Sequence, residues 1–250
     1  MKTCMIKNIE IGKGKPKICL PIVGTTDIDI FEQAYSFEKY HYDMVELRID
    51  YYQDVFNFEA VNKLLKKLRT ILSCPIIFTC RTLKEGGEIE LSDEKYFQLL
   101  KTAMMSQCID LVDIELMNEY QLLYQLVELA HQHNVKVIMS NHDFTCTPEL
   151  SVIKERLEKM EILGADILKI AYMPISKKDV VRMLDTTMLM SEKLDKPIVS
   201  MSMGELGKIT RICGELSGSV ITFASAGKVS APGQIYVEDM ECLFEAIHHD

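Results

Sequence analysis

The stretch KVIMSNHDFTCTPELSVIKERLEKMEILGADILKIA, residues 136–171, contains two short apolar segments with a longer amphipathic segment between them. The short segments, 136–143 and 167–171, are nearly continuous runs of apolar residues, a pattern typical of strands buried in a parallel sheet. The middle segment has apolar residues at three- and four-residue spacing, with Pro148 near its start and Gly164 just past its end, as is usual for helices. The stretch therefore predicts a strand, a helix and a second strand parallel to the first.

The same alternation extends over the rest of the chain in both directions. Helical patterns such as FEAVNKLLKKLRTIL (58–72) and QLLYQLVELAHQH (121–133) separate further apolar runs rich in Val and Ile. Eight units of this kind predict a (β/α)₈ barrel, the TIM-barrel fold of the α/β class. Residues 4–12 precede the first unit and are expected to form a strand or hairpin that caps the bottom of the barrel. The eight runs expected to be strands are 17–24, 44–50, 75–81, 111–116, 136–143, 167–171, 197–203 and 220–225.

The length of the chain fits one barrel. Its 250 residues match the usual size of such a fold, and no linker or low-complexity segment divides them. Apolar residues make up 48% of the chain, which is enough to build a sizeable core. We therefore expect residues 1–250 to form a single catalytic domain.

Charge and cysteine content narrow the class of protein. A formal net charge of −9 disfavours nucleic acid and anionic membranes as partners, but leaves a small anionic substrate open if Arg and Lys converge locally. The eight cysteines form no C-x-x-C pair and no zinc-finger spacing, so we expect reduced thiols and a cytoplasmic protein. We expect neither a secretory signal nor a membrane span, because no long apolar stretch is present.

Polar residues concentrate at the ends of the predicted strands. In a barrel of this kind the active site lies at the C-terminal ends of the strands, so side chains from different strands converge there. Glu46 and Arg48 are two residues apart and point to the same face, as do Asp113 and Glu115. Charges buried in this way are costly unless they are paired or used in chemistry.

Lys169 lies within the apolar run ILKIA, and a lysine is rarely buried without a role. One interpretation is a nucleophilic amine that forms a Schiff base with a carbonyl substrate. The alternative is a structural ion pair with a carboxylate such as Glu115. His142, at the end of the preceding strand, is expected to transfer protons, the alternative being a structural histidine.

Three arginines and one loop form the candidate binding residues. Arg48, Arg81 and Arg211 offer rigid guanidinium donors for a carboxylate or hydroxyl groups, although a structural network with acidic residues is the alternative. The loop AGKVSAPGQ (226–234) is expected to be a lid over bound substrate rather than an ordinary surface loop.

Eight motifs, read in order, carry a resemblance to a known family. They resemble type I 3-dehydroquinate dehydratases, which act in the shikimate pathway, over nearly the whole chain. Schiff-base aldolases share the barrel and the lysine, but not SNHDF followed by SAPGQ. Two departures are that the second strand reads Glu-Leu-Arg where many relatives have Glu-Trp-Arg, and that Pro21 stands where some have Ser. The motifs are ELRID (46–50), FTCR (78–81), EGGE (85–88), SNHDF (140–144), LKIA (168–171), MSMG (201–204), GKITR (207–211) and SAPGQ (230–234).

The resemblance implies a lyase that converts 3-dehydroquinate to 3-dehydroshikimate and water without a metal or organic cofactor. Lys169 matches the Schiff-base lysine, His142 the general acid/base, and Glu85 the carboxylate that helps to orient the histidine or to relay protons to it. Arg211 is the candidate for binding the substrate carboxylate. The resemblance also suggests a homodimer. The remaining positions that match the substrate-binding set are Glu46, Arg48, Arg81, Ser230 and Gln234.

Three other functions remain open at this level. A Schiff-base aldolase would keep Lys169 but cleave a carbon–carbon bond. A ligand-binding barrel without activity would need no amine nucleophile. A metal-dependent enzyme would use the acidic cluster to hold a divalent cation. Its candidate ligands are Glu46, Asp113, Glu115, His142 and Asp143.

Overall fold

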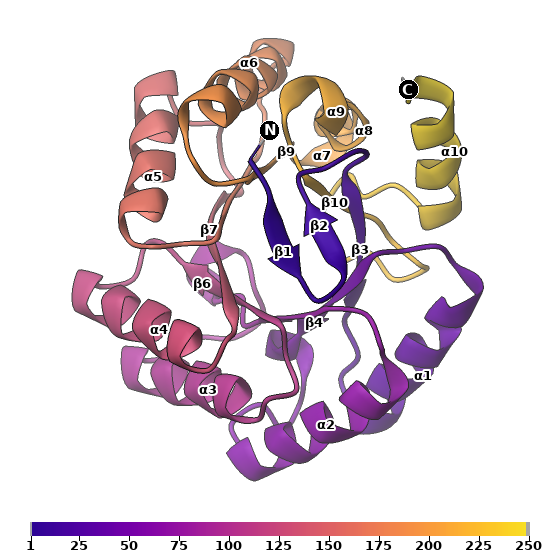
Figure 1. Ribbon diagram of the computed structural model, residues 1–250, viewed down its shortest axis with the longest axis vertical. Coiled ribbons are helices and arrows are strands. Elements are labelled where there is room, and N and C mark those ends of the chain that lie inside the picture. Colours follow the sequence, from indigo (N-terminus) through magenta and orange to yellow (C-terminus); the bar gives the residue numbers. More distant parts are fainter. Residues whose placement is uncertain (1, 249–250) are drawn as a thin grey trace.

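The computed structural model describes residues 2–248, and its centre is a parallel sheet of eight strands curled into a nearly closed barrel (Figure 1). Each strand lies almost entirely within one of the eight predicted apolar runs, so the predicted barrel is confirmed. The strands are buried on both faces, which explains their continuous apolar sequence. Their bounds are β3 (Lys17–Ile22), β4 (Met44–Arg48), β5 (Ile76–Thr79), β6 (Leu111–Glu115), β7 (Lys136–Asp143), β8 (Ile167–Tyr172), β9 (Ile198–Ser202) and β10 (Ile221–Phe223).

The sheet closes between its last strand and its first strand. The strand order is β10-β3-β4-β5-β6-β7-β8-β9, and β10 pairs in parallel with β3. On the other side, β9 and β10 are joined by a bridge between Ile198 and Ser219 and by a hydrogen bond from Val220 N to Ile198 O of 2.9 Å. The short strand β10 thus completes the barrel, and its last residue, Phe223, lies at the C-terminal end of the barrel.

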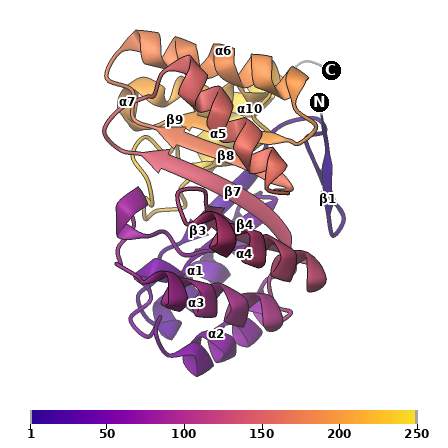
Figure 2. The ribbon, with the colours of Figure 1, turned by 90° about the vertical axis from the view of Figure 1, so that its left-hand side faces the viewer.

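Helices surround the barrel and pack their apolar sides against it (Figure 2). Sequence-local contacts fix where they begin: the side chain of Asn57 caps α2, and Thr26 with Asp29 forms a capping box on α1. Between β9 and β10 three short helices replace a single long one. The helices are α1 (Asp27–Ser36), α2 (Phe58–Ile71), α3 (Asp93–Met105), α4 (Tyr120–Gln132), α5 (Leu150–Ile162), α6 (Lys177–Lys193), α7 (Gly204–Gly207), α8 (Ile209–Ile212), α9 (Gly214–Ser217) and α10 (Val237–Ile247), with 3₁₀ turns η1 (Phe37–Lys39), η2 (Ile49–Tyr51) and η3 (Leu83–Glu85).

An antiparallel hairpin of β1 (Cys4–Ile6) and β2 (Ile9–Ile11) covers the end of the barrel at which the strands start (Figures 1 and 2). Ile6 and Ile11 are buried in the same apolar cluster as side chains from inside the barrel, such as Ile77. The predicted cap at the bottom of the barrel is therefore confirmed. It leaves the opposite end, where the strands finish, open for a site.

Two further expectations concern the whole chain. Within residues 2–248, no helix combines the length and the apolar character that crossing a membrane requires. All eight cysteines are free thiols. Burial raises the pKa values of Cys19 and Cys80 well above their ordinary range, so these two thiols are poor nucleophiles.

Candidate active site

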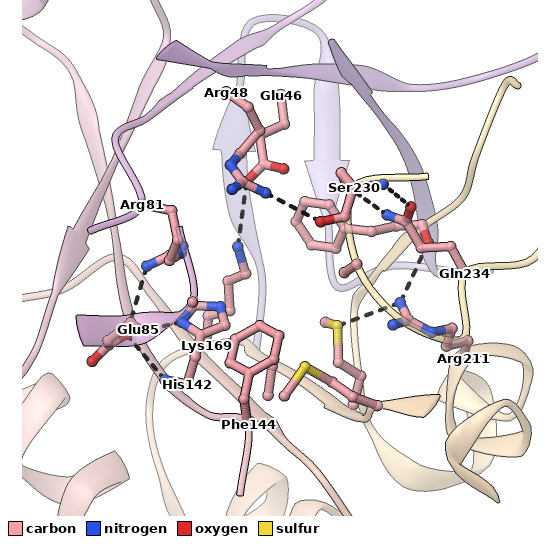
Figure 3. A pocket seen from close by; sticks show the side chains of 16 residues that line it. Glu46, Arg48, Arg81, Glu85, His142, Phe144, Lys169, Arg211, Ser230 and Gln234 are labelled. Atoms are coloured by element: carbon pink, nitrogen blue, oxygen red, sulfur yellow. Dashed lines mark hydrogen bonds and ion pairs between the residues drawn. The ribbon is translucent and has the colours of Figure 1, made fainter. Parts of the chain in front are cut away.

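A pocket opens at the C-terminal ends of the strands, and all nine site residues expected from the sequence line it (Figure 3). They come from four strands or strand ends, from the 3₁₀ turn η3, from α8 and from the segment that follows β10. The sequence did not single out the apolar part of the wall. That part consists of Phe144, Ala171, Met201, Met203, Phe223 and Ala231.

Lys169 lies on β8 with its amine inside the barrel. Its side chain is 5% exposed, and Nζ donates a hydrogen bond to Asp113 Oδ2 at 3.0 Å. Glu46 Oε1 is 3.5 Å from the same nitrogen. Nζ also lies 4.4 Å from the centre of the Phe223 ring. The lysine is therefore surrounded by negative charge and an aromatic face, which stabilise a cation at this nitrogen.

Asp113 is held in place by three donors. Besides Lys169, it accepts hydrogen bonds from Arg81 Nη2 at 3.0 Å and Ser140 Oγ at 2.5 Å. Burial acts to raise the pKa of this carboxyl, but the charges of Arg81 and Lys169 outweigh it and hold the pKa well below its usual range. Asp113 is thus a permanent counter-charge next to the amine. Glu115, the lysine partner considered from sequence, instead binds Arg81 at 2.9 Å and Thr82 Oγ1 at 2.6 Å.

His142 and Glu85 form a hydrogen-bonded pair beside the lysine. Nδ1 of His142 lies 2.9 Å from Glu85 Oε2, and the backbone N–H of His142 donates to the same oxygen at 3.0 Å. Within residues 2–248, Nε2 of His142 has no hydrogen-bond partner, so it remains available to a substrate. Burial and the charges of Arg81 and Lys169 lower the pKa of His142 well below its ordinary value. The imidazole is therefore neutral before substrate binds.

Glu85 ends η3, and the glycine after it allows this turn to pack against the ring of Phe144, two residues after His142. Gly86 adopts φ +80°, a left-handed conformation that favours glycine, and an added Cβ would lie 2.2 Å from the Phe144 ring. Burial raises the pKa of Glu85 to about 8, against the opposing effect of the Arg81 charge. This carboxyl therefore titrates near neutral pH.

The segment after β10 is tied to the pocket by hydrogen bonds. Ser230 N donates to Gln234 Oε1 at 2.8 Å, and Gln234 Nε2 donates to Ser230 Oγ at 2.9 Å. Arg48 Nη1 donates to Ser230 O at 3.4 Å while its Nε and Nη2 bind Asp50. The first two contacts join Ser230 and Gln234 to each other, and the third links their segment to β4, so that both side chains line the pocket (Figure 3).

Arg211, on α8, is the unusual arginine of the site. It is 2% exposed. Within residues 2–248 it contacts no carboxylate: Nη1 reaches Phe223 O at 3.4 Å, Nη2 reaches Pro232 O at 3.1 Å, and Nε has no partner. Burial lowers the pKa of its guanidinium to about 10. A buried charge without a counter-ion is unfavourable, so an anionic group at this point of the pocket would stabilise the guanidinium.

The acidic residues considered as metal ligands are occupied by other partners. Arg81 and Lys169 engage Glu46, Asp113 and Glu115 in hydrogen bonds or ion pairs, and Asp143 accepts hydrogen bonds from the loop residues that follow it. In the part of the chain that the structure describes, no three or more His, Cys, Asp or Glu side chains are grouped so as to hold a metal ion.

Comparisons with known proteins agree on one family. The family model described as type I 3-dehydroquinase matches residues 18–250. A 3-dehydroquinate dehydratase from Listeria welshimeri is 47% identical, with 99% of each chain covered. One from Bacillus licheniformis is 42% identical, with 100% of this chain and 99% of the relative covered.

Solved structures give the same result at the level of the fold. The type I 3-dehydroquinate dehydratase from Clostridium difficile, solved with covalently modified comenic acid, superposes with a TM-score of 0.96 at 41% identity, covering 99% of both chains. The enzyme from Geobacillus kaustophilus also gives 0.96, at 34% identity and with 98% and 96% covered.

Proposed function

The chain belongs to the type I 3-dehydroquinase family and catalyses the dehydration of 3-dehydroquinate, and we propose that Lys169, His142 and Glu85 carry this reaction. The observation that supports the assignment best is the environment of Lys169. It is a buried amine with two carboxylates beside it, in a pocket that also holds a neutral histidine and an arginine without a counter-ion. These are the groups that an imine-forming dehydration of an anionic hydroxyketone requires.

The first half of the reaction makes the substrate's α-hydrogen acidic. Nε2 of His142 takes a proton from the protonated amine of Lys169, and the free amine then adds to the ketone carbon C3 to form a carbinolamine. The carbinolamine hydroxyl takes that proton back from His142 and leaves as water, which gives an iminium. Asp113 and Glu46 stabilise this cation because both lie within 3.5 Å of the nitrogen. The iminium then withdraws electrons from the neighbouring C2–H bond.

The second half removes the hydroxyl group. Nε2 of His142 takes a proton from C2, and the electron pair moves into the carbon–nitrogen system to form an enamine. The enamine expels the C1 hydroxyl, which takes the same proton from His142 and leaves as water. Glu85 accepts the Nδ1–H hydrogen bond throughout, so it keeps one tautomer and stabilises the imidazolium. Hydrolysis of the imine releases 3-dehydroshikimate and restores the amine.

The remaining polar residues hold the substrate. Arg211 binds the C1 carboxylate, while Ser230 and Gln234 close over the ring from the segment after β10. Arg48, Arg81 and Glu46 face the ring hydroxyls from the ends of β4 and β5. Because acidic partners already fix Arg48 and Arg81, little side-chain entropy is lost when the substrate binds.

Borohydride trapping tests the proposal directly. The protein is incubated with 3-dehydroquinate, reduced with borohydride and digested, and the modified peptide is identified by mass spectrometry. A reduced adduct on Lys169 is the expected result. Turnover without any adduct would show that dehydration proceeds without a covalent intermediate, and would refute the assignment.

Replacing Arg211 by methionine should weaken substrate binding without weakening the fold. Loss of a charge-assisted contact to a carboxylate is expected to raise KM by roughly 10- to 100-fold. The melting temperature should stay the same or rise, because the substitution removes a buried cation without an acidic partner. Steady-state kinetics and thermal denaturation measure both effects.

Arg69→Met is the matched control, since Arg69 pairs with Asp110 away from the pocket. That variant should melt at a lower temperature and keep its KM. An unchanged KM in Arg211→Met would remove Arg211 from the carboxylate site.

The pH profile of kcat/KM should report the ionisation of Glu85. The pair needs Glu85 as a carboxylate, so that His142 can act as a base, and the pKa of Glu85 is raised to about 8. Activity is therefore expected to rise with pH through this region, and to fall about tenfold per unit on the acid side. In Glu85→Gln this acid limb of the kcat/KM profile should disappear, and the plateau value of kcat/KM at higher pH should be lower than in the parent. If Glu85→Gln kept the same acid limb, the ionisation that causes it would belong to another group.

We also propose that residues 1–250 act as one catalytic domain, that the enzyme works in the cytoplasm, and that it functions as a homodimer. Free cysteines are typical of a reducing compartment and support the second point. The family resemblance supports the third. Analytical ultracentrifugation of the purified chain tests it, and a monomer at all concentrations used would contradict it.

A further inference from the structure

Arg156 reaches from outside the barrel toward the catalytic pair. It lies on α5 and is half-buried. Within residues 2–248 it forms no ion pair with a carboxylate, and its polar contacts run inward instead. Its Nη1 donates to Asn141 Oδ1 at 2.7 Å and to the hydroxyl oxygen of Tyr172 at 3.3 Å. A charged side chain on a peripheral helix thus donates its hydrogen bonds to two neutral groups near the ends of β7 and β8.

These contacts fix the orientation of the Asn141 amide. Its Oδ1 accepts hydrogen bonds from both Arg156 and the Tyr172 hydroxyl, the latter at 2.9 Å, while Nδ2 donates to Glu85 Oε1 at 2.9 Å. Rotating the amide by 180° would place an NH₂ group against two donors and a carbonyl oxygen against a carboxylate. Arg156 and Tyr172 therefore permit one orientation, in which an N–H points at Glu85.

Asn141 in turn completes the set of donors around Glu85. Oε1 accepts from Asn141, and Oε2 accepts from the backbone and the ring of His142. With both oxygens engaged, the plane of the carboxylate is fixed, and so is the direction in which it holds the imidazole. Asn141 is 2% exposed and Tyr172 is fully buried, so water does not replace these contacts in the folded protein.

We propose that Arg156 and Tyr172 are positioning residues for the reaction, acting through Asn141 to hold Glu85 and His142 in the geometry for proton transfer. This inference rests on the roles proposed above for Glu85 and His142. Neither Arg156 nor Tyr172 lines the pocket, so they are expected to affect the rate of proton transfer and not the extent to which the imine forms.

The test replaces Arg156 with methionine, which keeps the length of the side chain but removes the donors. Turnover is expected to fall by about tenfold or more, the size of a lost charge-assisted hydrogen bond. The KM should stay within about twofold of the parent value, because substrate contacts are intact. Borohydride should still trap an adduct on Lys169 to the same extent. Arg156→Lys, which restores a charged donor, should recover part of the lost turnover.

The pH profile separates positioning from a general loss of structure. The hydrogen bond from Asn141 lowers the pKa of Glu85, so loosening it should move the acid limb of kcat/KM to higher pH. The other groups that face Glu85 are Arg81 after β5, Asp113 and Glu115 on β6, and His142 on β7, and none is altered. Tyr172→Phe, which removes only the hydroxyl, should shift the limb in the same direction with a smaller effect on turnover.

Arg182→Met is the matched control, because Arg182 is also a half-buried helix arginine that donates to a neighbouring loop, at Thr147 O and Pro148 O. It should leave the pH limb in place. The inference is overturned if Arg156→Met and Tyr172→Phe keep the parent pH profile, or if the only change in both is a higher KM. If the parent protein itself forms no adduct on Lys169, the proposed function fails instead, and the two failures are therefore distinguishable.

Discussion

Methionine at position 169 is expected to lower turnover by at least about 10⁴-fold and to abolish the borohydride-reducible adduct with 3-dehydroquinate. Lys169 is the only lysine among the residues that line the pocket, so no other amine can take its place in the described part of the chain. Methionine has a similar length and fills the space beneath Phe223. Without the iminium, the C2 hydrogen keeps its ordinary low acidity, and His142 has no activated substrate to deprotonate.

The variant should still fold, because Asp113 keeps Arg81 and Ser140 as partners when the lysine is removed. Lys136→Met is the control: Lys136 is also a strand lysine paired with an aspartate, Asp166, but lies where β7 begins, at the other end of the barrel. That variant should keep both adduct and turnover. Turnover within tenfold of the parent in Lys169→Met would mean that the reaction needs no imine.

The architecture could be predicted because burial on both sides of a parallel strand leaves a simple sequence signal. The run 136–143 coincides with β7, whereas the run 44–50 is longer than β4, which ends at Arg48. The difference has a local cause. Asp50 turns back to bind Arg48, and residues 49–51 form a 3₁₀ turn, so the chain leaves the sheet while its sequence still contains apolar residues.

The sequence predicted that the candidate side chains would lie together, and they line one pocket, but it did not predict how they pair there. Asp113 and Glu115 point to the same face, and the sequence does not say which of them is level with Lys169. In the sheet register Glu115 lies opposite Ser140, and Ser140 lies opposite Lys169. The shear of such a barrel is about eight residues over eight strands, or about one residue per strand. From β6 to β8, two strands apart, residues in register therefore differ in height along the barrel axis by about two residues. The lysine therefore meets Asp113.

The contacts of Arg156 could not be predicted from the sequence for a different reason. In the sequence it is one of several charged residues on the amphipathic segment that became α5, and its spacing does not distinguish it from a solvated side chain. Its role depends on how α5 packs over β7 and β8, which places it beside Asn141. Contacts of this kind arise from tertiary packing and leave no local pattern.

Replacing His142 by alanine should lower turnover by about 10²- to 10⁴-fold, the usual contribution of a general acid/base group, while Lys169 remains open to trapping by borohydride. The two steps have separate requirements. Imine formation needs the amine and its counter-charges, which stay in place, and over a long incubation water can carry its protons in place of His142. Transfer of the C2 proton to the leaving hydroxyl instead needs a neutral base that Glu85 holds in one orientation.

The variant should therefore accumulate a covalent complex that the parent converts quickly to product. Mass spectrometry after reduction measures the adduct, and the absorbance of the conjugated product measures turnover. His131→Ala serves as the control, because His131 is paired with Asp166 at the bottom of the barrel, far from the pocket residues, and its loss should change neither reading. If His142→Ala turned over at nearly the parent rate, another group would have to move the proton. If it formed no adduct, water could not replace His142 in imine formation, and the expected accumulation of the covalent complex would be wrong.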